Sequence, residues 1–334
     1  MSDSTKKLMN IQGAVTDSWN VEQIWTLNPG FGYQIQACPR VTSDATTVYN
    51  FFSNFSVPMG ETELFYTNHG VPISEDVSWD YPNRYKVVQG DDANGYYVKK
   101  GYSTNKGNLN REERYYADVA FDGSIWFGFG NTDDNNPNYI NAVNGAASPS
   151  DPISYNSTGY WPKKLVPYLT ASANSSFVQK GYSWPFMRLT ALWLLYAECL
   201  NEANGPTADA YKWIDAVRTR AGLPGVQQAW STYSRNPSKP STKEGLRDII
   251  HQERRIELAF EGRAGWDLRR WKELQNLFAT PFVGWSVQTL AKTTSAYYNL
   301  HTVYQPQFGL KDYLFPIQKY DLLVNSNLVQ TPYW

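Results

Sequence analysis

The sequence contains few of the residues that build metal centres or disulfide frameworks. Its 334 residues include two cysteines, Cys38 and Cys199, and three histidines, without HExxH or CxxC spacing. Two thiols so far apart in the sequence predict neither a disulfide framework nor a zinc site. We therefore expect no transition-metal chemistry, no bound metal and no cofactor. Cys199 lies within a helical apolar pattern, and its thiol is expected to be buried.

Excess charge and long apolar runs are also lacking. Thirty Lys and Arg residues nearly balance 31 Asp and Glu residues, which gives a net charge of -1 at pH 7. A protein that binds nucleic acid or an anionic membrane surface would carry a basic excess. No apolar run is long enough to cross a bilayer, and the first residues, MSDSTKKLMNIQGAV, lack the features of a signal peptide. Taken alone, these absences favour a cytoplasmic protein.

Aromatic residues, in contrast, are abundant. They make up 16% of the sequence, with 13 Trp and 24 Tyr. Both side chains join a flat apolar body to a polar tip, which suits interfaces and flat ligands. Glycans are one such ligand class, because the C–H faces of pyranose rings stack on aromatic planes. The alternative is that the rings fill the core of a loop-rich fold, and we expect this role for most of them, including Trp161 and Trp184.

The residue composition and the hydrophobic pattern of the sequence change near Trp184. Residues 1–183 are rich in Asn, Gly, Ser, Tyr and Pro, with short strand-like pieces such as RYKVVQG and SIWFGFG. One helix is expected there, near DSWNVEQIW. Residues 184–334 carry helical patterns and a C-terminal tail. We expect a loop-rich region that faces the ligand and a helical scaffold, integrated into one domain.

Helix signals in the second region begin with a hairpin. The first helix ends at Asn204–Pro206, and Thr207 caps a second helix that stops at Gly222. Two helices joined by a short turn form an αα-hairpin of tetratricopeptide size. The apolar stripe of the first helix comprises Leu189, Leu192, Trp193, Tyr196 and Leu200.

Two more helices are expected after this hairpin. The third starts at Ser241, which forms a capping box with Glu244. Its apolar stripe comprises Leu246, Ile249, Ile250, Ile256 and Phe260. Glu253 falls on the same stripe, and a carboxylate that faces the core needs a partner. We expect Arg263, Arg269 or Arg270 to supply it. A short fourth helix is expected around residues 266–274.

The segment ERRIELAFEGRAGWDLRRW, residues 253–271, places many acidic and basic side chains beside two tryptophans. Catalytic carboxylates need separated pKa values, whereas the surrounding arginines lower every carboxyl pKa. A polyanion site would need arginines without acids. We therefore interpret the segment as a structural ion network that fixes how helices meet, with Asp267 and Arg270 paired at i, i+3. Its members are Glu253, Arg254, Glu257, Glu261, Asp267 and Arg270.

Several ordered segments resemble the SusD/RagB family of glycan- and nutrient-binding outer-membrane lipoproteins of Bacteroidetes. They are RLTALWLLYAECLNEANG, AYKWIDAVRTRAGLP, LRDIIHQERRIELAFEGRAGWDLRRWKEL and the tail YLFPIQKYDLLVNSNLVQTPYW. Upstream, ETELFYTNHGVPISED and NREERYYADVAFDGSIWFG are also similar to family segments. The chain departs from the family pattern at Glu113, Arg263, Gln318 and Thr331.

The resemblance implies a mainly α fold, a tetratricopeptide-like α-α superhelix with a large loop-rich region that contains short strands. It implies a surface-exposed lipoprotein of the outer membrane that captures glycans for import with a SusC-like TonB-dependent transporter. Such a protein has no catalytic residues and meets the membrane only through a lipid anchor, which this chain lacks. Family members are longer, so the chain resembles a C-terminal portion.

In the family the ligand is held on a loop-built surface outside the helical scaffold. The loops before NREERYY carry the matching chemistry, because their rings offer stacking planes and their polar groups bind hydroxyls. The predicted ligand-binding residues are Trp79, Tyr81, Asn83, Arg84, Tyr96, Tyr97 and Tyr102.

Two other classes of protein stay open. A glycoside hydrolase needs two carboxylates that face each other across a cleft, and Asp118, Asp122 and Asp133 are available without a spacing that selects a pair. A tetratricopeptide-type interaction module explains the helix hairpin, but neither the aromatic loops nor the tail.

Overall fold

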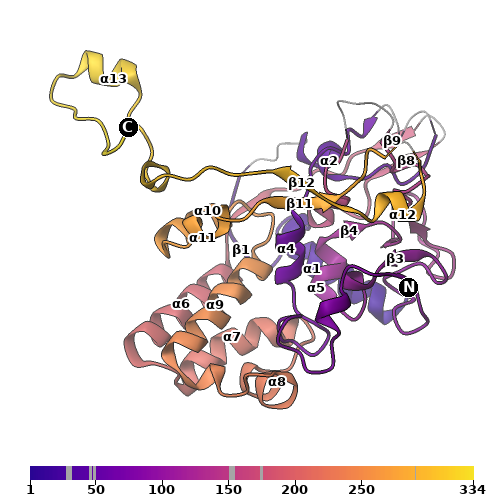
Figure 1. Cartoon of the computed structure of the whole chain (residues 1–334), viewed down its shortest axis with the longest axis horizontal. Helices are drawn as coiled ribbons and strands as arrows, with labels where there is room; N and C mark the ends of the chain where they lie inside the picture. Colours follow the sequence, from indigo (N-terminus) through magenta and orange to yellow (C-terminus); the bar gives the residue numbers. More distant parts are fainter. Residues whose placement is uncertain (28–31, 45–46, 48–49, 150–154, 174–175, 290) are drawn as a thin grey trace.

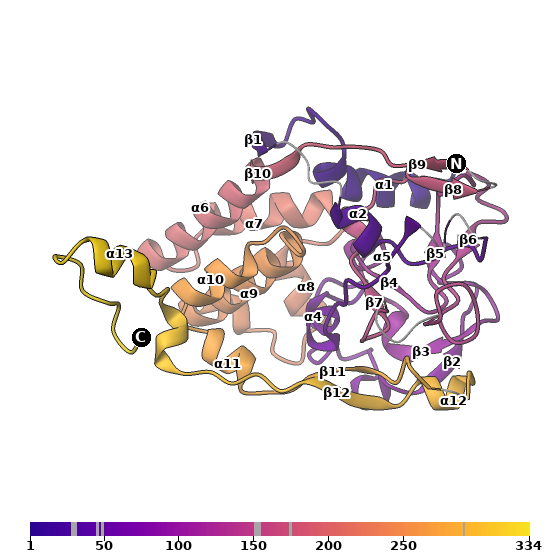
Figure 2. The ribbon, with the colours of Figure 1, turned by 90° about the horizontal axis from the view of Figure 1, so that it is seen from above.

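The computed structural model describes residues 1–27, 32–44, 47, 50–149, 155–173, 176–289 and 291–334. A group of helices formed by residues 189–278 lies beside a loop-rich body that contains the N-terminal region (Figure 1). After β12 the C-terminal segment runs past α10 and α11 and extends away from the body, as Figure 2 also shows. Among the described residues, no helix combines the length and the apolar character needed to cross a membrane.

The helical region begins with the predicted hairpin. Thr207 Oγ1 accepts a hydrogen bond from the Ala210 backbone N–H, and Gly205 follows the first helix with a positive φ of 75°. Both helix boundaries were therefore predicted correctly. The first helix, α6, packs on α7 and α9. The helices are α6 (Leu189–Asn204), α7 (Ala208–Arg220), α8 (Val226–Tyr233), α9 (Lys243–Glu257), α10 (Ala264–Arg270) and α11 (Leu274–Phe278).

The buried face of α6 differs from the predicted apolar stripe. Its buried residues are Thr190, Leu194, Ala197, Glu198 and Asn201. Leu192 and Tyr196 are 39% and 51% exposed, and the thiol of Cys199 is exposed as well. The predicted stripe is wrong at these positions, and so is the predicted burial of Cys199. Polar residues take the inward positions because they find partners there: Glu198 accepts hydrogen bonds from Arg270, for example.

Helix α9 starts one residue later than predicted. Ser241 ends a short 3-10 helix, η4 (Lys239–Ser241), and Thr242 Oγ1 accepts the hydrogen bond from the Gly245 backbone N–H. The predicted capping box of Ser241 and Glu244 is therefore wrong. The apolar stripe is confirmed at Leu246, Ile249, Ile250 and Ile256, which are all buried.

The loop-rich region contains more helix than predicted. Helix α1 (Asp3–Thr16) packs on α5 (Glu113–Asp118). The helix expected near residues 17–25 is wrong, because Gln23–Leu27 forms strand β1, which pairs antiparallel with β10 (Trp184–Arg188). The other helical elements are α2 (Gly32–Ala37), α4 (Met59–Leu64), η1 (Tyr81–Asn83), η2 (Lys106–Asn108) and η3 (Lys163–Leu165).

The strands of the described residues form two-stranded antiparallel sheets rather than one large sheet. Beyond β1 and β10, the pairs are β2 (Val87–Gln89) with β3 (Ser103–Asn105), β4 (Ala120–Phe121) with β7 (Tyr160–Trp161), β5 (Ile125–Trp126) with β6 (Asn138–Tyr139), β8 (Ala171–Ala173) with β9 (Ser176–Val178), and β11 (Phe282–Trp285) with β12 (Leu300–Tyr304). The C-terminal elements are α12 (Thr294–Tyr297), η5 (Leu310–Tyr313) and α13 (Lys319–Val324).

Aromatic side chains fill much of the core that joins the two regions. The largest buried rings include Trp126, Trp161, Trp230 and Trp285, each at most 2% exposed. Trp161 is therefore packed as predicted, and Trp184 is partly buried against the same core. Most of the energy of such rings comes from the apolar area that they remove from water.

Candidate functional site

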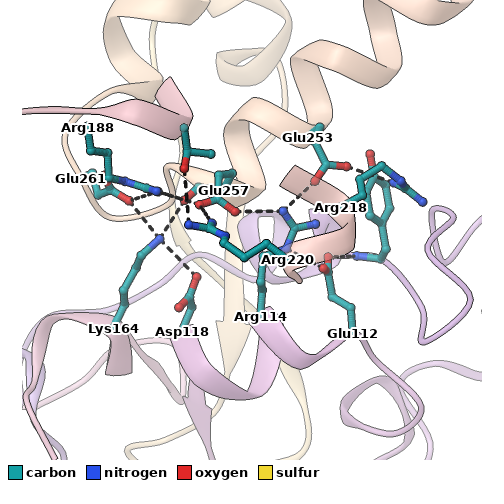
Figure 3. A network of polar contacts seen from close by, with 12 residues as sticks. Glu112, Arg114, Asp118, Lys164, Arg188, Arg218, Arg220, Glu253, Glu257 and Glu261 are labelled. Atoms are coloured by element: carbon teal, nitrogen blue, oxygen red, sulfur yellow. Dashed lines mark hydrogen bonds and ion pairs between the residues drawn. The ribbon is translucent and has the colours of Figure 1, made fainter. Parts of the chain in front are cut away.

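The charged segment that follows residue 250 lies in the interior. Glu253, Glu257 and Glu261 are spaced by four residues, and their side chains are at most 3% exposed. Arg114 of α5 reaches them from the loop-rich region: its Nη1 lies 2.6 Å from Glu253 Oε1 and 3.1 Å from Glu257 Oε2 (Figure 3). Its Nε also donates to Glu112 at 2.7 Å.

Three further buried cations and the partly exposed Arg220 belong to this network, in which Arg220 pairs with Glu257 and Glu22. Arg188 lies 2.8 Å from both Glu257 and Glu261, and Arg218 lies 3.0 Å from Glu253. Lys164 lies 3.0 Å from Glu261. The side chains of Arg188, Arg218 and Lys164 are at most 3% exposed, whereas that of Arg220 is 32% exposed at the edge of the network.

The predicted partners of Glu253 were wrong. Instead of Arg263, Arg269 or Arg270, the guanidinium groups of Arg114 and Arg218 hold this carboxylate. The reason is geometric: the i, i+4 spacing aims the three glutamates at the loop-rich region, whereas the chain turns away at Gly262, where φ is 75°.

Three members of the predicted ion network lie in a second group of ion pairs. Asp267 Oδ2 accepts from Arg254 Nε at 2.7 Å, and its Oδ1 accepts from Arg270 Nε at 2.9 Å, the pairing expected from the i, i+3 spacing. Arg270 also forms two hydrogen bonds of 2.6 Å with Glu198. This group ties α10 to α6 and α9.

Burial and pairing move the pKa values of the network in opposite directions. Burial raises the pKa of Asp118 to about 6, although Lys164, 3.3 Å away, opposes the rise. Burial also acts to raise the pKa of Glu257, but Arg220, Arg188 and Arg114 together hold it well below its usual range. A carboxyl with this many cations is a poor general acid, because it stays ionised.

The carboxylates considered for a hydrolase do not form a facing pair. Asp118 and Asp122 are buried, whereas Asp133 lies in an exposed turn and accepts a hydrogen bond from the Asn135 backbone N–H. Asp122 Oδ1 accepts from Tyr102 and Asp122 Oδ2 accepts from Tyr298. Both oxygens of Asp122 are therefore used within the fold.

A serine, a histidine and an aspartate also meet near the surface. His69 Nδ1 lies 2.8 Å from Asp76 Oδ2 and 3.3 Å from Ser78 Oγ. A nucleophilic triad needs the serine on one ring nitrogen and the aspartate on the other. Here both contacts use Nδ1, so the three residues do not form a proton relay.

The first group of predicted ligand-binding residues lies around η1. Trp79 is 8% exposed, and its Nε1 donates to the Leu109 backbone oxygen at 3.3 Å, so this ring packs inward. Tyr81, Asn83 and Arg84 are half-buried. The Arg84 guanidinium carbon lies 4.0 Å from the Tyr81 ring centre, which couples the cation to the ring.

The second group lies on the loop that follows β2. Tyr96 is 56% exposed. Tyr97 stacks on Tyr116 with ring centres 4.2 Å apart, and Tyr102 donates to Asp122 at 2.8 Å. Among the described residues, no hydrogen bond or ring contact joins this group to the group around η1. The seven assignments stay predictions; Trp79, Tyr97 and Tyr102 have packing roles in the fold.

The sequence analysis missed the cavities that surround α4. A cavity of about 500 Å³ lies between the segment before α4 and the turn after α9, and its walls include Phe55, Phe65 and Phe260. A second cavity of about 200 Å³ lies between α4 and β11. Glu61 lines both cavities. The segment ETELFYTNHGVPISED, which begins within α4, was recognised in the sequence, but nothing local predicts that α9 and β11 pack beside α4.

Comparison with known proteins gives the family. A family model described as the SusD family matches residues 21–334. SusD-like protein P2 of Formosa agariphila is 31% identical over 144 residues, which are 43% of this chain and 24% of that protein. SusD-like protein P25 of the same organism is 38% identical over 101 residues, which are 28% of this chain and 18% of that protein.

Solved structures agree in fold. A protein named BT4246 has a TM-score of 0.78 and 25% identity over 98% of this chain and 53% of its own. A SusD-like protein, BF3747 from Bacteroides fragilis, has a TM-score of 0.69 and 20% identity over 98% of this chain and 57% of its own. The chain thus spans little more than half the length of these solved relatives. Its helical fold and the match over nearly its whole length show that the chain belongs to the SusD family.

Proposed function

We propose that this chain is the glycan-binding portion of a surface-exposed outer-membrane lipoprotein that passes oligosaccharides or polysaccharides to a SusC-like TonB-dependent transporter. The family membership supports the proposal, and so does a surface that suits sugars. That surface is formed by Tyr81, Asn83 and Arg84 around η1. We include in the proposal that the α6–α7 hairpin is a unit of a tetratricopeptide-like superhelix.

The observation that carries the proposal is the arrangement of Arg84. Its guanidinium carbon lies 4.0 Å from the ring centre of Tyr81 and 4.1 Å from that of Tyr85, and its Nε donates to Glu63 at 2.8 Å. These contacts fix rings and polar groups before a ligand arrives, which lowers the entropy that binding costs. A pyranose that stacks on a fixed ring beside an amide and a carboxylate finds both apolar and hydrogen-bonding partners.

A binding role without catalysis fits the chemistry around this surface. Its charged groups are paired: Arg84 with Glu63 at 2.8 Å, and Lys106 with Asp80 at 2.5 Å. The hydrogen bond from Lys106 lowers the pKa of Asp80, whereas a glycoside hydrolase needs one protonated carboxyl as its general acid. We therefore propose that the chain retains glycans and does not cleave them.

Affinity electrophoresis in gels that contain candidate polysaccharides tests this function. The double variant Tyr81→Ala, Asn83→Ala is expected to bind about tenfold more weakly, as for other central aromatic contacts. Tyr196→Ala is the matched control, because it removes an exposed ring from α6, outside the predicted ligand-binding residues, and it should leave retention unchanged. If the wild-type chain is retarded by no polysaccharide, the function is wrong. If retardation survives the double variant, only the site is wrong.

A reducing-sugar assay on the retained polysaccharide separates binding from hydrolysis. A binding protein releases no reducing ends above the blank. Release that persists after further purification would favour the hydrolase instead.

A further inference from the structure

A small cavity between α4 and β11 lies beside the proposed glycan surface. Figure 1 shows α4 next to β11 and α9, and its residues contact both elements. The cavity holds about 200 Å³, less than the ~300–1,000 Å³ of pockets for drug-sized ligands, so it suits one ring of a longer chain. Its lining residues include Glu61, Glu63, Tyr85, Leu277, Thr280 and Phe282.

Two aromatic side chains form fixed walls of this cavity. The Tyr85 ring meets the buried Trp285 edge-on, with centres 6.0 Å apart and planes at 87°. Phe282 is placed by the β11–β12 pair, where it lies opposite Tyr304, with ring centres 6.2 Å apart. Each ring is therefore held by the fold rather than by a ligand.

Two carboxylates supply hydrogen-bond acceptors at the same place. Glu61 Oε1 accepts from Arg255 Nη2 at 2.7 Å, and Glu63 Oε1 accepts from Arg84 Nε at 2.8 Å and from the Tyr85 hydroxyl at 2.7 Å. The Oε2 atom of each glutamate accepts no hydrogen bond from a described residue. Their side chains are 31% and 25% exposed, so these oxygens are within reach of a ligand.

The charge at this cavity selects among glycans. Among the residues that the structure describes, its lining contains two carboxylates and no lysine or arginine. Both nearby guanidinium groups, Arg84 and Arg255, already donate to these carboxylates. A sulfate or uronate group would thus meet carboxylate oxygens without a free cation, and like charges at such distances repel. Sugar hydroxyls, in contrast, donate to free carboxylate oxygens in charge-assisted hydrogen bonds.

We infer that the cavity formed by Glu61, Glu63, Tyr85 and Phe282 is a second sugar subsite, and that it selects uncharged, hydroxyl-rich glycans. The inference rests on the proposed function. Tyr85 connects the subsite to the surface around η1, because the Arg84 guanidinium contacts both the Tyr81 and the Tyr85 rings. One glycan chain therefore extends from Tyr81 across Tyr85 to Phe282.

Calorimetric titration of the full chain with two sets of oligosaccharides tests the subsite. One set is neutral glucans and mannans, and the other is uronate-containing and sulfated oligosaccharides of similar length. The wild-type chain is expected to bind a neutral member and to bind the anionic members at least about tenfold more weakly. Phe282→Ala should weaken neutral binding about tenfold. Tyr196→Ala is the control, because its exposed ring lies on α6, outside the lining of this cavity. If Phe282→Ala has a lower melting temperature than the wild type, Phe282→Leu replaces it in the titration.

The double variant Glu61→Gln, Glu63→Gln tests the charge argument. Each amide keeps an acceptor oxygen and removes a negative charge, so the preference for neutral over anionic glycans should shrink at least about fivefold. If the wild-type chain binds an anionic glycan, and if its affinity falls as salt is added, the proposed selectivity is wrong. The proposed function would still stand. If the affinity for neutral oligosaccharides is unchanged in both Phe282→Ala and Phe282→Leu, the subsite assignment is wrong. If the wild-type chain binds no oligosaccharide of either set, the proposed function is wrong.

Discussion

The same charged residue types occur in two regions of this protein with different consequences. In the interior, Arg114 and Arg218 hold Glu253 with side chains at most 1% exposed. Around η1, Arg84 holds Glu63 with side chains that are 20% and 25% exposed. The distances are alike, between 2.6 and 3.0 Å. The difference is access to water, and it decides which region is architecture and which is available to a ligand.

Burial makes the interior network a condition of folding. Removing charges from water costs several kcal/mol per ion, and only complete reciprocal pairing offsets this cost. Arg114 comes from the loop-rich region, Arg218 from α7 and Glu253 from α9, so pairing is complete only when all three elements meet. A surface pair sets no such condition, because water solvates either partner when the other is lost.

The largest expected effect comes from breaking the interior network at Arg114. Arg114→Met leaves Glu112 and Glu253 in the interior without one of their cations, and it should lower the free energy of unfolding by ~3–5 kcal/mol. Urea denaturation followed by tryptophan fluorescence measures the loss. A loss below about 1 kcal/mol would mean that the network behaves like a surface pair.

A smaller effect distinguishes the two regions by pH. Burial raises the pKa of Asp122 to about 6 from 3.8, although hydrogen bonds from Ala142 and Tyr298 lower it. This carboxyl is then protonated to a greater extent in the folded than in the unfolded chain between pH 4 and 6, so its contribution to stability falls as the pH rises through this window. The share of Asp122 is on the order of 3 kcal/mol, from about two pKa units.

Asp122→Asn should remove the part of the stability decrease that Asp122 causes between pH 4 and 6. Asp118, whose pKa is also raised to about 6, should still cause a decrease in the variant. Asp80 on the surface is the control. Its hydrogen bond with Lys106 lowers its pKa, so its contribution changes below pH 4 and Asp80→Asn should keep the slope. Thermal melts across pH 4–7 measure all three chains. Equal slopes in the wild type and Asp122→Asn would contradict the assignment.

The smallest stability effect is expected at the surface pair. Arg84→Met should cost at most ~1 kcal/mol, because the pair with Glu63 is partly exposed. The same change removes the cation that positions Tyr81 and Tyr85, so glycan retention should fall while the melting temperature moves by a few degrees. This variant and Arg114→Met form a matched pair. The comparison fails if Arg84→Met destabilises the fold as much as Arg114→Met does.

Local signals in the sequence predicted what depends on neighbours along the chain. Thr207 was identified as a helix cap, and Glu253 as a carboxylate on an inward face, because capping and helical periodicity involve residues within one or two turns. The same methods misplaced the start of α9 by one residue, because Ser241 ends the 3-10 helix η4 and Thr242 takes the cap.

Errors arose where distant partners reverse a local preference. The polar residues Glu198 and Asn201 face inward on α6, while Leu192 faces outward. A carboxylate is stable in the interior only when it has a partner there. The partner of Glu198 is Arg270, which lies 72 residues further along the chain. Residues 23–25 form a strand because Trp184–Arg188 lies beside them, which no local pattern shows.

The family, the helical hairpin and an inward ion network could be predicted from the sequence, because ordered motifs and helical spacing are local properties of the chain. The tertiary structure alone decided which cations neutralise Glu253, which rings are packed and which stay exposed, and where cavities open beside α4. Those outcomes depend on the burial of each group and on the distance to partners far away in the sequence. Burial sets the energy of a charge or a ring, and burial exists only once the chain has folded.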